Sequence, residues 1–190
     1  ADPDIVFRVR TRNLSPTFGS PIGAQMLDVY IHDPAGGATS TAAAFPQRNY
    51  VMTAAGAWNK RLEVQGFGQQ FVDAGGTTLG TITIGGNAIS RFITFRVPKA
   101  ALGTPASGWA FTVVLTGQDG FSPDQARGFQ ATPQDFQFGV CAPGGTDPLC
   151  GFSPNLVPKA LDVIPPSSIS QATELNPLLG PVVLHGVAIP

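Results

Sequence analysis

The chain has 190 residues, of which 43% are hydrophobic and only 12% are charged, and its formal net charge is −1. This length fits one domain, so we expect a single domain over residues 1–190. The first residues lack a signal-peptide pattern and lead almost directly into a predicted strand, so we expect the chain to be a fragment or a processed part of a larger protein. The balanced charge excludes the basic surface that binds nucleic acid. No apolar run approaches the roughly 20 residues of a membrane-spanning helix, so direct membrane insertion is not expected.

Alternation of apolar and polar residues begins near the N-terminus and recurs along the chain. In residues 4–12, Ile5, Phe7 and Val9 alternate with arginines, which is typical of a strand with one buried face. The same pattern predicts half-buried strands in LDVYIH, residues 27–32, and in RLEVQGF, residues 61–67. Further predicted strands are TTLGTITI, AISRFITFRV, WAFTVVLTG, DFQFGV and VVLHGVAI.

Helical patterning is almost absent. VPKAALG is consistent with a single turn, and Ser168 to Gln171 resembles a capping box that opens a short helix ending at Leu175. The candidate strands are separated by turns rich in glycine and proline, such as DPAGG, GGNA and IPPSS. The pattern predicts an all-β fold, an antiparallel β-sandwich with little helix.

The two cysteines lie close together, and the loop between them is rich in proline and glycine. Cys141 and Cys150 enclose APGGTDPL, which predicts a disulfide that closes a short loop. Free thiols and a metal site are the alternatives, although CxxC spacing and nearby histidines are missing. A disulfide implies an oxidising, extracytoplasmic location.

No motif for catalysis occurs in the chain. GxSxG, HExxH, a P-loop and a dinucleotide fingerprint are all missing. His32 and His185 are the only histidines, and Glu63 and Glu174 are the only glutamates. Each histidine lies in an alternating strand, where a structural role is typical, so we expect that this chain is not itself an enzyme.

The segment LTGQDGFSPDQARGF, residues 115–129, combines two aspartates and an arginine with glycines and a proline. Asp119-Gly120 and Ser122-Pro123-Asp124 are ordinary turn signals. Asp119 and Asp124 are also candidates for a calcium site, although a calcium loop requires more regularly spaced oxygen ligands. The other interpretation is a structural loop in which Arg127 pairs with an aspartate and holds the segment against the sheet.

Aromatic residues are the candidates for ligand binding, because sugars stack on flat rings that are surrounded by polar groups. Trp58, Tyr50 and Phe121 lie at predicted strand ends or in loops, so we name them as candidate ligand-binding residues. Trp109 begins an alternating strand with Phe111, which favours a place in the core.

An ordered series of segments resembles a known family, the C-terminal binding module of glucodextranase, which also occurs in amylopullulanase-type enzymes and is DOMON-like and surface-layer-like. The series is MLDVYIHDPAGG, AWNKRLEVQGFG, ITFRVPKAALG, WAFTVVLTGQDGFSPDQARGF, DFQFGV and PNLVPKALDVIPP. The resemblance implies a noncatalytic β-sandwich of a secreted polysaccharide-degrading enzyme, whose catalysis belongs to a separate domain.

The resemblance also implies a role, binding carbohydrate or attaching the enzyme to the cell surface, with polysaccharide or cell-wall glycan as the partner. The alternative function is a structural subunit of a cell-envelope, surface-layer-associated complex with protein partners. Both place the chain outside the cytoplasm. Some DOMON relatives bind haem through methionine and histidine, but no motif aligns Met26, Met52, His32 and His185 for that role, so no cofactor beyond calcium is considered.

Overall fold

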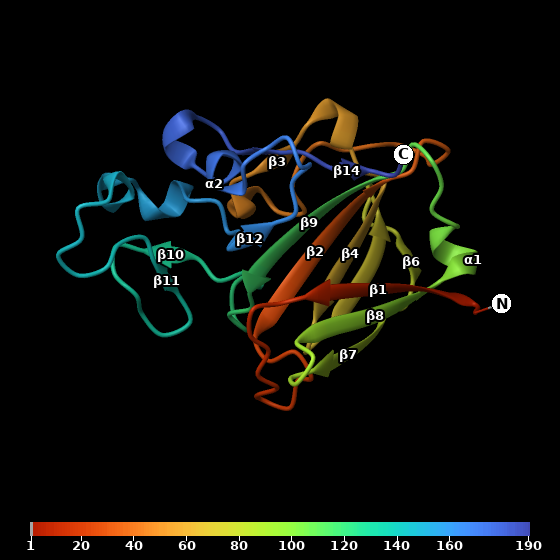
Figure 1. Cartoon of the computed structure of the whole chain (residues 1–190), viewed down its shortest axis with the longest axis horizontal. Helices are drawn as coiled ribbons and strands as arrows, with labels where there is room; N and C mark the ends of the chain where they lie inside the picture. Colours follow the sequence, from red (N-terminus) through yellow and green to blue (C-terminus); the bar gives the residue numbers. More distant parts are fainter. Residues whose placement is uncertain (1) are drawn as a thin grey trace.

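The computed structural model describes residues 2–190, and two antiparallel sheets form its framework (Figure 1). The smaller, three-stranded sheet has the order β1 (Asp4–Arg10), β8 (Phe92–Pro98), β7 (Thr83–Asn87). The larger, seven-stranded sheet has the order β12 (Asp162–Val163), β9 (Ala110–Gly117), β2 (Gln25–His32), β4 (Lys60–Gln65), β5 (Gln69–Asp73), β6 (Thr78–Gly80), with β14 (Val187–Ala188) also paired to β9. The predicted all-β sandwich is confirmed.

The main hydrophobic core lies between these two sheets. Phe7 of β1 stacks on Phe95 of β8 with ring centroids 4.8 Å apart, and it meets Phe111 of β9 edge-on at 6.2 Å. Because the first pair lies within the small sheet and the second pair spans both sheets, Phe7 joins the two layers. Trp109 is also buried in this core, as the sequence predicted.

A third layer covers the other face of the large sheet. It consists of loops and short elements, which in Figure 1 lie at the top of the view, while β1, β8 and β7 lie at the bottom. Its pieces are the parallel pair β3 (Val51–Met52) and β13 (Val183–Leu184), the helix α2 (Gln171–Glu174), and the 3-10 turns Pro46–Arg48, Ala54–Gly56 and Pro177–Leu179. A second apolar cluster, which includes Tyr30, Trp58 and Leu184, fills the space between this layer and the sheet.

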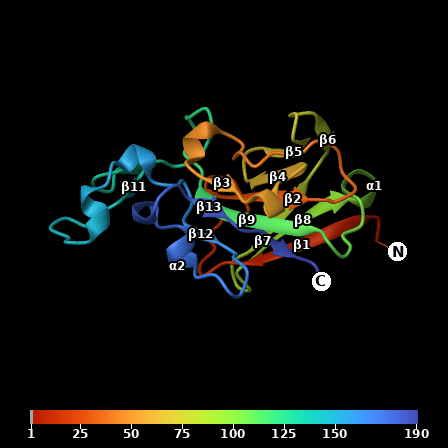
Figure 2. The ribbon, with the colours of Figure 1, turned by 90° about the horizontal axis from the view of Figure 1, so that it is seen from above.

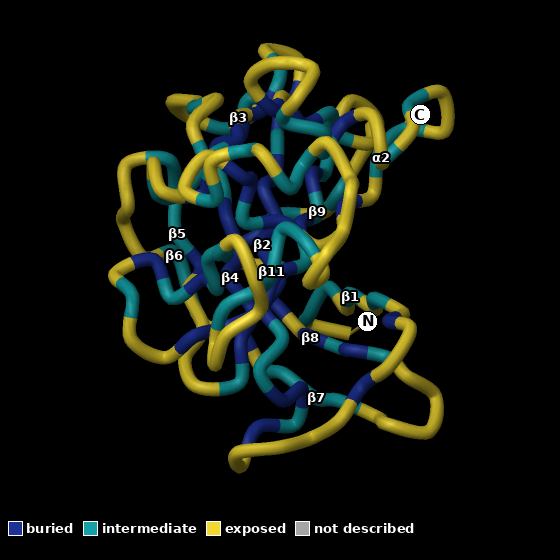
Figure 3. Tube along the Cα trace, turned by 90° about the vertical axis from the view of Figure 1, so that its left-hand side faces the viewer, coloured by how far each residue is buried: buried dark blue, intermediate teal, exposed yellow. Residues whose placement is uncertain are grey.

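The third layer corrects one prediction from the sequence. The alternation in β2 and β4 predicts strands that are buried on one face only, but both faces are covered, and Figure 3 shows the two strands in the buried interior. Asp28 is 0% exposed and Glu63 is 2% exposed. The prediction of a half-buried strand was therefore wrong for both, because the polar face holds charged groups that neutralise one another beneath the loops.

Other elements differ from the pattern in smaller ways. TTLGTITI divides into β6 and β7, which belong to different sheets, and β5 was not predicted. The expected single turn is α1 (Lys99–Leu102). A short helix does form before Leu175, but its N-cap is Ser170 and no side chain caps it, so the predicted capping box is wrong.

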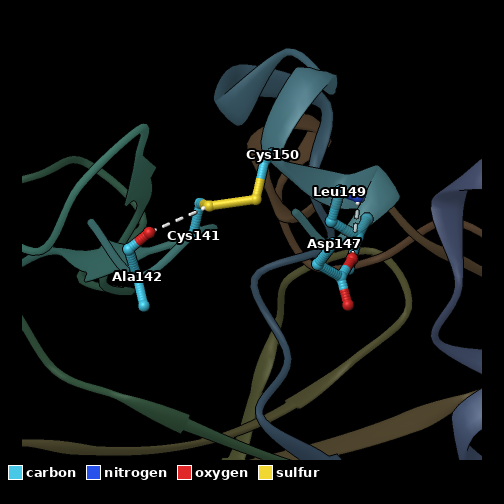
Figure 4. The surroundings of a disulfide bond; sticks show 5 residues. All are labelled: Cys141, Ala142, Asp147, Leu149 and Cys150. Carbon is cyan, nitrogen blue, oxygen red and sulfur yellow. Dashed lines mark hydrogen bonds between the residues drawn. A yellow bond between two sulfur atoms is a disulfide. The ribbon is translucent and has the colours of Figure 1, made fainter. Parts of the chain in front are cut away.

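A lobe extends away from the sheets on the side opposite the N-terminus (Figures 1 and 2). It contains the parallel pair β10 (Phe129–Gln130) and β11 (Phe138–Gly139) and the 3-10 turns Pro148–Gly151 and Pro154–Leu156. The predicted disulfide joins Cys141 to Cys150 across a sequence separation of 9 (Figure 4). Most residues between 131 and 151 are exposed or half-buried, so the lobe has little core of its own.

We expect the disulfide to protect the lobe rather than the sandwich. Closing a loop of this length stabilises by about 2–3 kcal/mol in the chain-entropy description. The double variant Cys141→Ser with Cys150→Ser should be cleaved by protease between residues 128 and 156 much faster than the unsubstituted chain. Mass spectrometry of the fragments checks this, and new cleavage within β2 or β9 would contradict it.

Candidate functional site

The polar face of the large sheet carries a buried network of charges. The Arg61 guanidinium of β4 contacts Asp28 of β2 at 3.3 Å and Glu63 at 2.8 Å. Gln65 donates to the same glutamate at 2.9 Å. Buried charges are costly unless they are paired and hydrogen-bonded, so these groups require further cationic partners from the third layer.

Arg48 is the partner that the third layer supplies. Its side chain is 0% exposed, and Nη1 donates to Asp28 Oδ2. Nη2 donates to the backbone oxygen of Asp124 at 2.7 Å, and Nε lies 3.2 Å from Asp124 Oδ2. Burial by itself lowers the pKa of the Arg48 guanidinium. The neighbouring Asp28 carboxylate raises this pKa by more, so it lies above its ordinary value. Arg48 thus remains a fixed cation that bonds the sheet to the loop after β9.

The chain around Arg48 is shaped to deliver it inward. Pro46 opens the 3-10 turn, and its fixed φ suits the first position of such a turn. Asn49 ends the turn in the left-handed region, with φ 58°, and its side-chain amide donates to Asn155 O at 2.8 Å and Val157 O at 3.0 Å. Asparagine tolerates this conformation better than most residues. The turn is therefore tied to residues 155–157 as well as to the sheet.

The loop after β9 is the segment that contained the predicted acidic site. Asp119 accepts hydrogen bonds from the amides of Phe121 and Ser122, each at 3.1 Å, and Gly120 has φ 83°. The predicted turn at Asp119-Gly120 is therefore present. The Asp119 carboxylate accepts these bonds and so holds the backbone of the turn that carries Phe121.

Asp124 pairs with cations other than the one expected. Lys159 Nζ contacts its two carboxylate oxygens at 2.9 and 3.0 Å, and Arg48 contacts it from the other side. Burial raises the pKa of Asp124. The hydrogen bond from Lys159 and the nearby positive charges lower this pKa by more, so the net shift is downward. Arg127 instead donates to Gln118 O at 3.0 Å and lies over the rings of Phe136 and Phe138.

A pocket of about 530 Å³ opens above this network. Three segments form its walls, residues 46–49, 119–130 and 154–159, with Gln137 added from the lobe. We call it the amide pocket, because side-chain amides dominate its polar lining: Gln47, Asn49, Gln130, Gln137 and Asn155. Phe121 and Phe129 provide aromatic surface, and Asp119 and Lys159 are the two charged residues of the lining.

The structure places the three candidate aromatic residues very differently. Phe121 is 65% exposed and lines the amide pocket. Trp58 is 5% exposed, its Nε1 donates to Ala42 O at 2.7 Å, and its ring packs on Tyr30. Tyr50 is 4% exposed, its hydroxyl lies 3.1 Å from that of Tyr30, and burial raises the pKa of both phenols. Only Phe121 therefore offers a ring face to a ligand.

Tyr50 also belongs to a second, more apolar pocket of about 580 Å³. This apolar pocket shares Pro46 and Asn49 with the amide pocket, so the two are neighbours. Its other walls are mostly aliphatic, aromatic or proline residues: Ala42, Ala43, Val51, Phe152, Leu156, Pro177, Pro181 and Val182.

The residues considered for a metal or for haem are occupied by internal contacts. Among residues 2–190, no group of three or more acidic, histidine or cysteine side chains is arranged to hold a metal ion. The Asp124 oxygens face cations, which does not fit a calcium ligand. Met26 and Met52 are buried, His32 bonds to Ala57 O, and His185 bonds to Glu174.

Sequence reasoning did not identify Arg48, Lys159 or the amide residues of the pocket. A signal for the first two was present, because Asp28 stands in the middle of a strand, where aspartate is disfavoured, opposite charged residues of the next strand. Such a group requires buried cations from elsewhere in the chain. Nothing in the sequence marks Gln47, Gln130, Gln137 or Asn155 as neighbours.

The chain is a β-sandwich protein with a covering third layer and an open, amide-lined pocket. The family comparison agrees: residues 1–180 match the family described as the C-terminal binding-module, SLH-like, of glucodextranase, and the chain belongs to this family. A search of curated proteins returns no match. Membership implies a noncatalytic domain of a larger enzyme.

Two further observations concern the helices and the disulfide. No helix in the part of the chain that the structure describes has the length and apolar character needed to cross a membrane. The bridge between Cys141 and Cys150 is consistent with an extracytoplasmic, oxidising location.

We expect removal of the Arg48 charge to be strongly destabilising. Arg48→Met leaves Asp28 buried and without one of its cations, which should lower the free energy of unfolding by about 3–5 kcal/mol. Urea denaturation followed by tryptophan fluorescence measures the change. The matched control is Arg96→Met, because Arg96 makes an exposed ion pair with Asp2 and should cost about 0–1 kcal/mol. Similar small losses in both variants would contradict a structural role for the network.

Lys159 should set the acid stability of the loop after β9. In the folded chain the pKa of Asp124 lies below its ordinary value of 3.8. The ionised Asp124 therefore stabilises the fold fully above pH 3.8, and this stabilisation disappears as the pH falls through the lowered pKa. In Lys159→Met that pKa rises, and the midpoint of acid unfolding should move to higher pH. Circular dichroism from about pH 2 to neutral measures it. Lys99→Met is the control, since the Lys99 ammonium donates to the exposed backbone oxygen of Asp2 and lies far in the chain from Asp124, and an equal shift there would refute the assignment.

Proposed function

We propose that this chain is the carbohydrate-binding or cell-surface-attachment module of a secreted polysaccharide-degrading enzyme, and that the amide pocket is its binding site. The observation that carries the proposal is the exposed Phe121 ring in a pocket lined by side-chain amides. Flat apolar rings match the apolar faces of sugars, while amides both donate and accept hydrogen bonds, as sugar hydroxyls do.

The fixed walls of the pocket support binding rather than turnover. Arg48, Asn49 and Lys159 bond its three segments to one another, so a ligand meets a site that is already formed. Preformed sites lose less conformational entropy on binding. Glycoside hydrolysis requires two carboxyl groups on opposite sides of the scissile bond, whereas Asp119 is the one carboxylate of the lining. Catalysis is therefore assigned to a separate domain.

The apolar pocket favours a second candidate, a structural subunit of a cell-envelope complex. Leu156 lies in its wall and is 60% exposed, and most of the remaining wall is also apolar. Contiguous exposed apolar surface is typical of contact with protein. In this second candidate the chain contacts envelope proteins there rather than glycan in the amide pocket.

The test of the first candidate is retention of the purified chain on insoluble α-glucan and on purified cell wall. Phe121→Ala removes the exposed ring, so affinity for the retained material should fall about tenfold. Phe67→Ala is the matched control, because Phe67 is also exposed, at 51%, but lies at the β4–β5 turn outside the pocket.

The outcomes separate the candidates. Loss of retention in Phe121→Ala with retention kept in Phe67→Ala supports glycan binding in the amide pocket. No retention of the unsubstituted chain, together with co-purification in a large envelope complex, would replace it with the structural subunit.

A further inference from the structure

We propose that the amide pocket selects uncharged glycans and discriminates against glycans that carry carboxylate, sulfate or phosphate groups. This inference rests on the proposed function, because it names the class of ligand for the same site. It follows from what the charged residues in and below the pocket are already bonded to.

Lys159 is the single cation in the lining that the structure describes, and it is saturated. Its Nζ donates to Asp124 Oδ1 at 2.9 Å, to Asp124 Oδ2 at 3.0 Å and to Ala126 O at 3.2 Å. An ammonium group has three N–H donors, so all of them have acceptors within the protein. A carboxylate or phosphate on a ligand would have to displace a buried aspartate to reach this charge.

The charges beneath the pocket give no residual attraction for an anion. They form one connected set in which three cations face three carboxylates: Arg48, Arg61 and Lys159 against Asp28, Glu63 and Asp124. The set is neutral as a whole. Arg48 is fully buried, and two of its nitrogens donate to protein oxygens, so its guanidinium cannot form the forked contact by which arginine recognises carboxylate and phosphate.

The remaining charge at the pocket has the wrong sign for an anionic ligand. Asp119 lines the pocket and has no cation among its described partners, which are the amides of Phe121 and Ser122. Its negative charge is partly offset by those amides, but it still repels an anion that enters. An acidic glycan would therefore lose hydration without gaining an opposite charge.

The uncharged groups, in contrast, are free to bind. Within residues 2–190, the side-chain amides of Gln47, Gln130, Gln137 and Asn155 have no hydrogen-bond partner in the protein. Each offers two donors and an acceptor oxygen. A chain of sugar hydroxyls, which also donate and accept, matches this lining without needing any charge.

Pairs of polysaccharides with the same backbone, one neutral and one carboxymethylated, test the inference. The probes are soluble starch with carboxymethyl starch, and hydroxyethyl cellulose with carboxymethyl cellulose, each immobilised in affinity electrophoresis gels. We expect the neutral member of at least one pair to retard the chain, and its carboxymethyl partner to bind about tenfold more weakly. Equal or tighter binding of the carboxymethyl member would overturn the inference.

A substitution that adds a free cation gives the converse result. Gln137→Lys places an ammonium group in the lining, so binding of the carboxymethyl member should increase and the preference for the neutral member should shrink. Gln171→Lys is the matched control. The substitution adds the same net charge, but Gln171 lies in α2, outside the pocket. An equal gain in both variants would show a general charge effect and overturn the assignment to this pocket.

The failure of this inference can be distinguished from failure of the proposed function. If the chain is retained on purified cell wall but not after the anionic polymers of the wall are extracted, it binds an acidic glycan, and only the present inference fails. If it binds none of the four polysaccharides and no cell wall, the proposed function fails and this inference with it.

Discussion

The third layer depends on the contacts that the Arg48 guanidinium makes with the large sheet and with the loop after β9. This guanidinium brings a full positive charge to the centre of the large sheet, where Asp28 would otherwise be buried without sufficient compensation. A charge in that place must be held by several hydrogen bonds at once. The same guanidinium therefore fixes both the turn that carries it and the loop after β9, whose backbone oxygen it binds. The positions of this turn and this loop at the surface therefore depend on a buried ion pair in the interior.

The third layer makes the large sheet unusual for an antiparallel sheet, which commonly has one face in water. Here one face is covered by a sheet and the other by loops, and the two interfaces differ in chemistry. The interface with the small sheet is apolar and aromatic, while the interface with the loops combines an apolar cluster with paired charges. The charged side determines which loop lies where, because each cation has particular acceptors.

The sequence contained enough information for the strands but not for the site. Period-two alternation located β1, β2, β4, β8 and β9, since strand geometry places successive side chains on opposite faces whatever the partner. Alternation cannot say what covers the polar face, so Asp28 and Glu63 were placed at an exposed face when they are buried. The disulfide was predictable because its cysteines are neighbours in the chain. The amide pocket was not, because residues about 100 positions apart, such as Asn49 and Asn155, meet only after the third layer has packed.

The shared wall between the two pockets has a consequence for how the module could be re-engineered. Pro46 and Asn49 separate the amide pocket from the apolar pocket, and the turn that holds them is anchored from below by Arg48. Loops on many β-sandwiches are replaceable because their ends alone connect to the framework. In this module the recognition surface extends into the sheet itself, so transplanting its specificity to another scaffold would mean transferring the acidic and basic residues of β2 and β4 together with the loops.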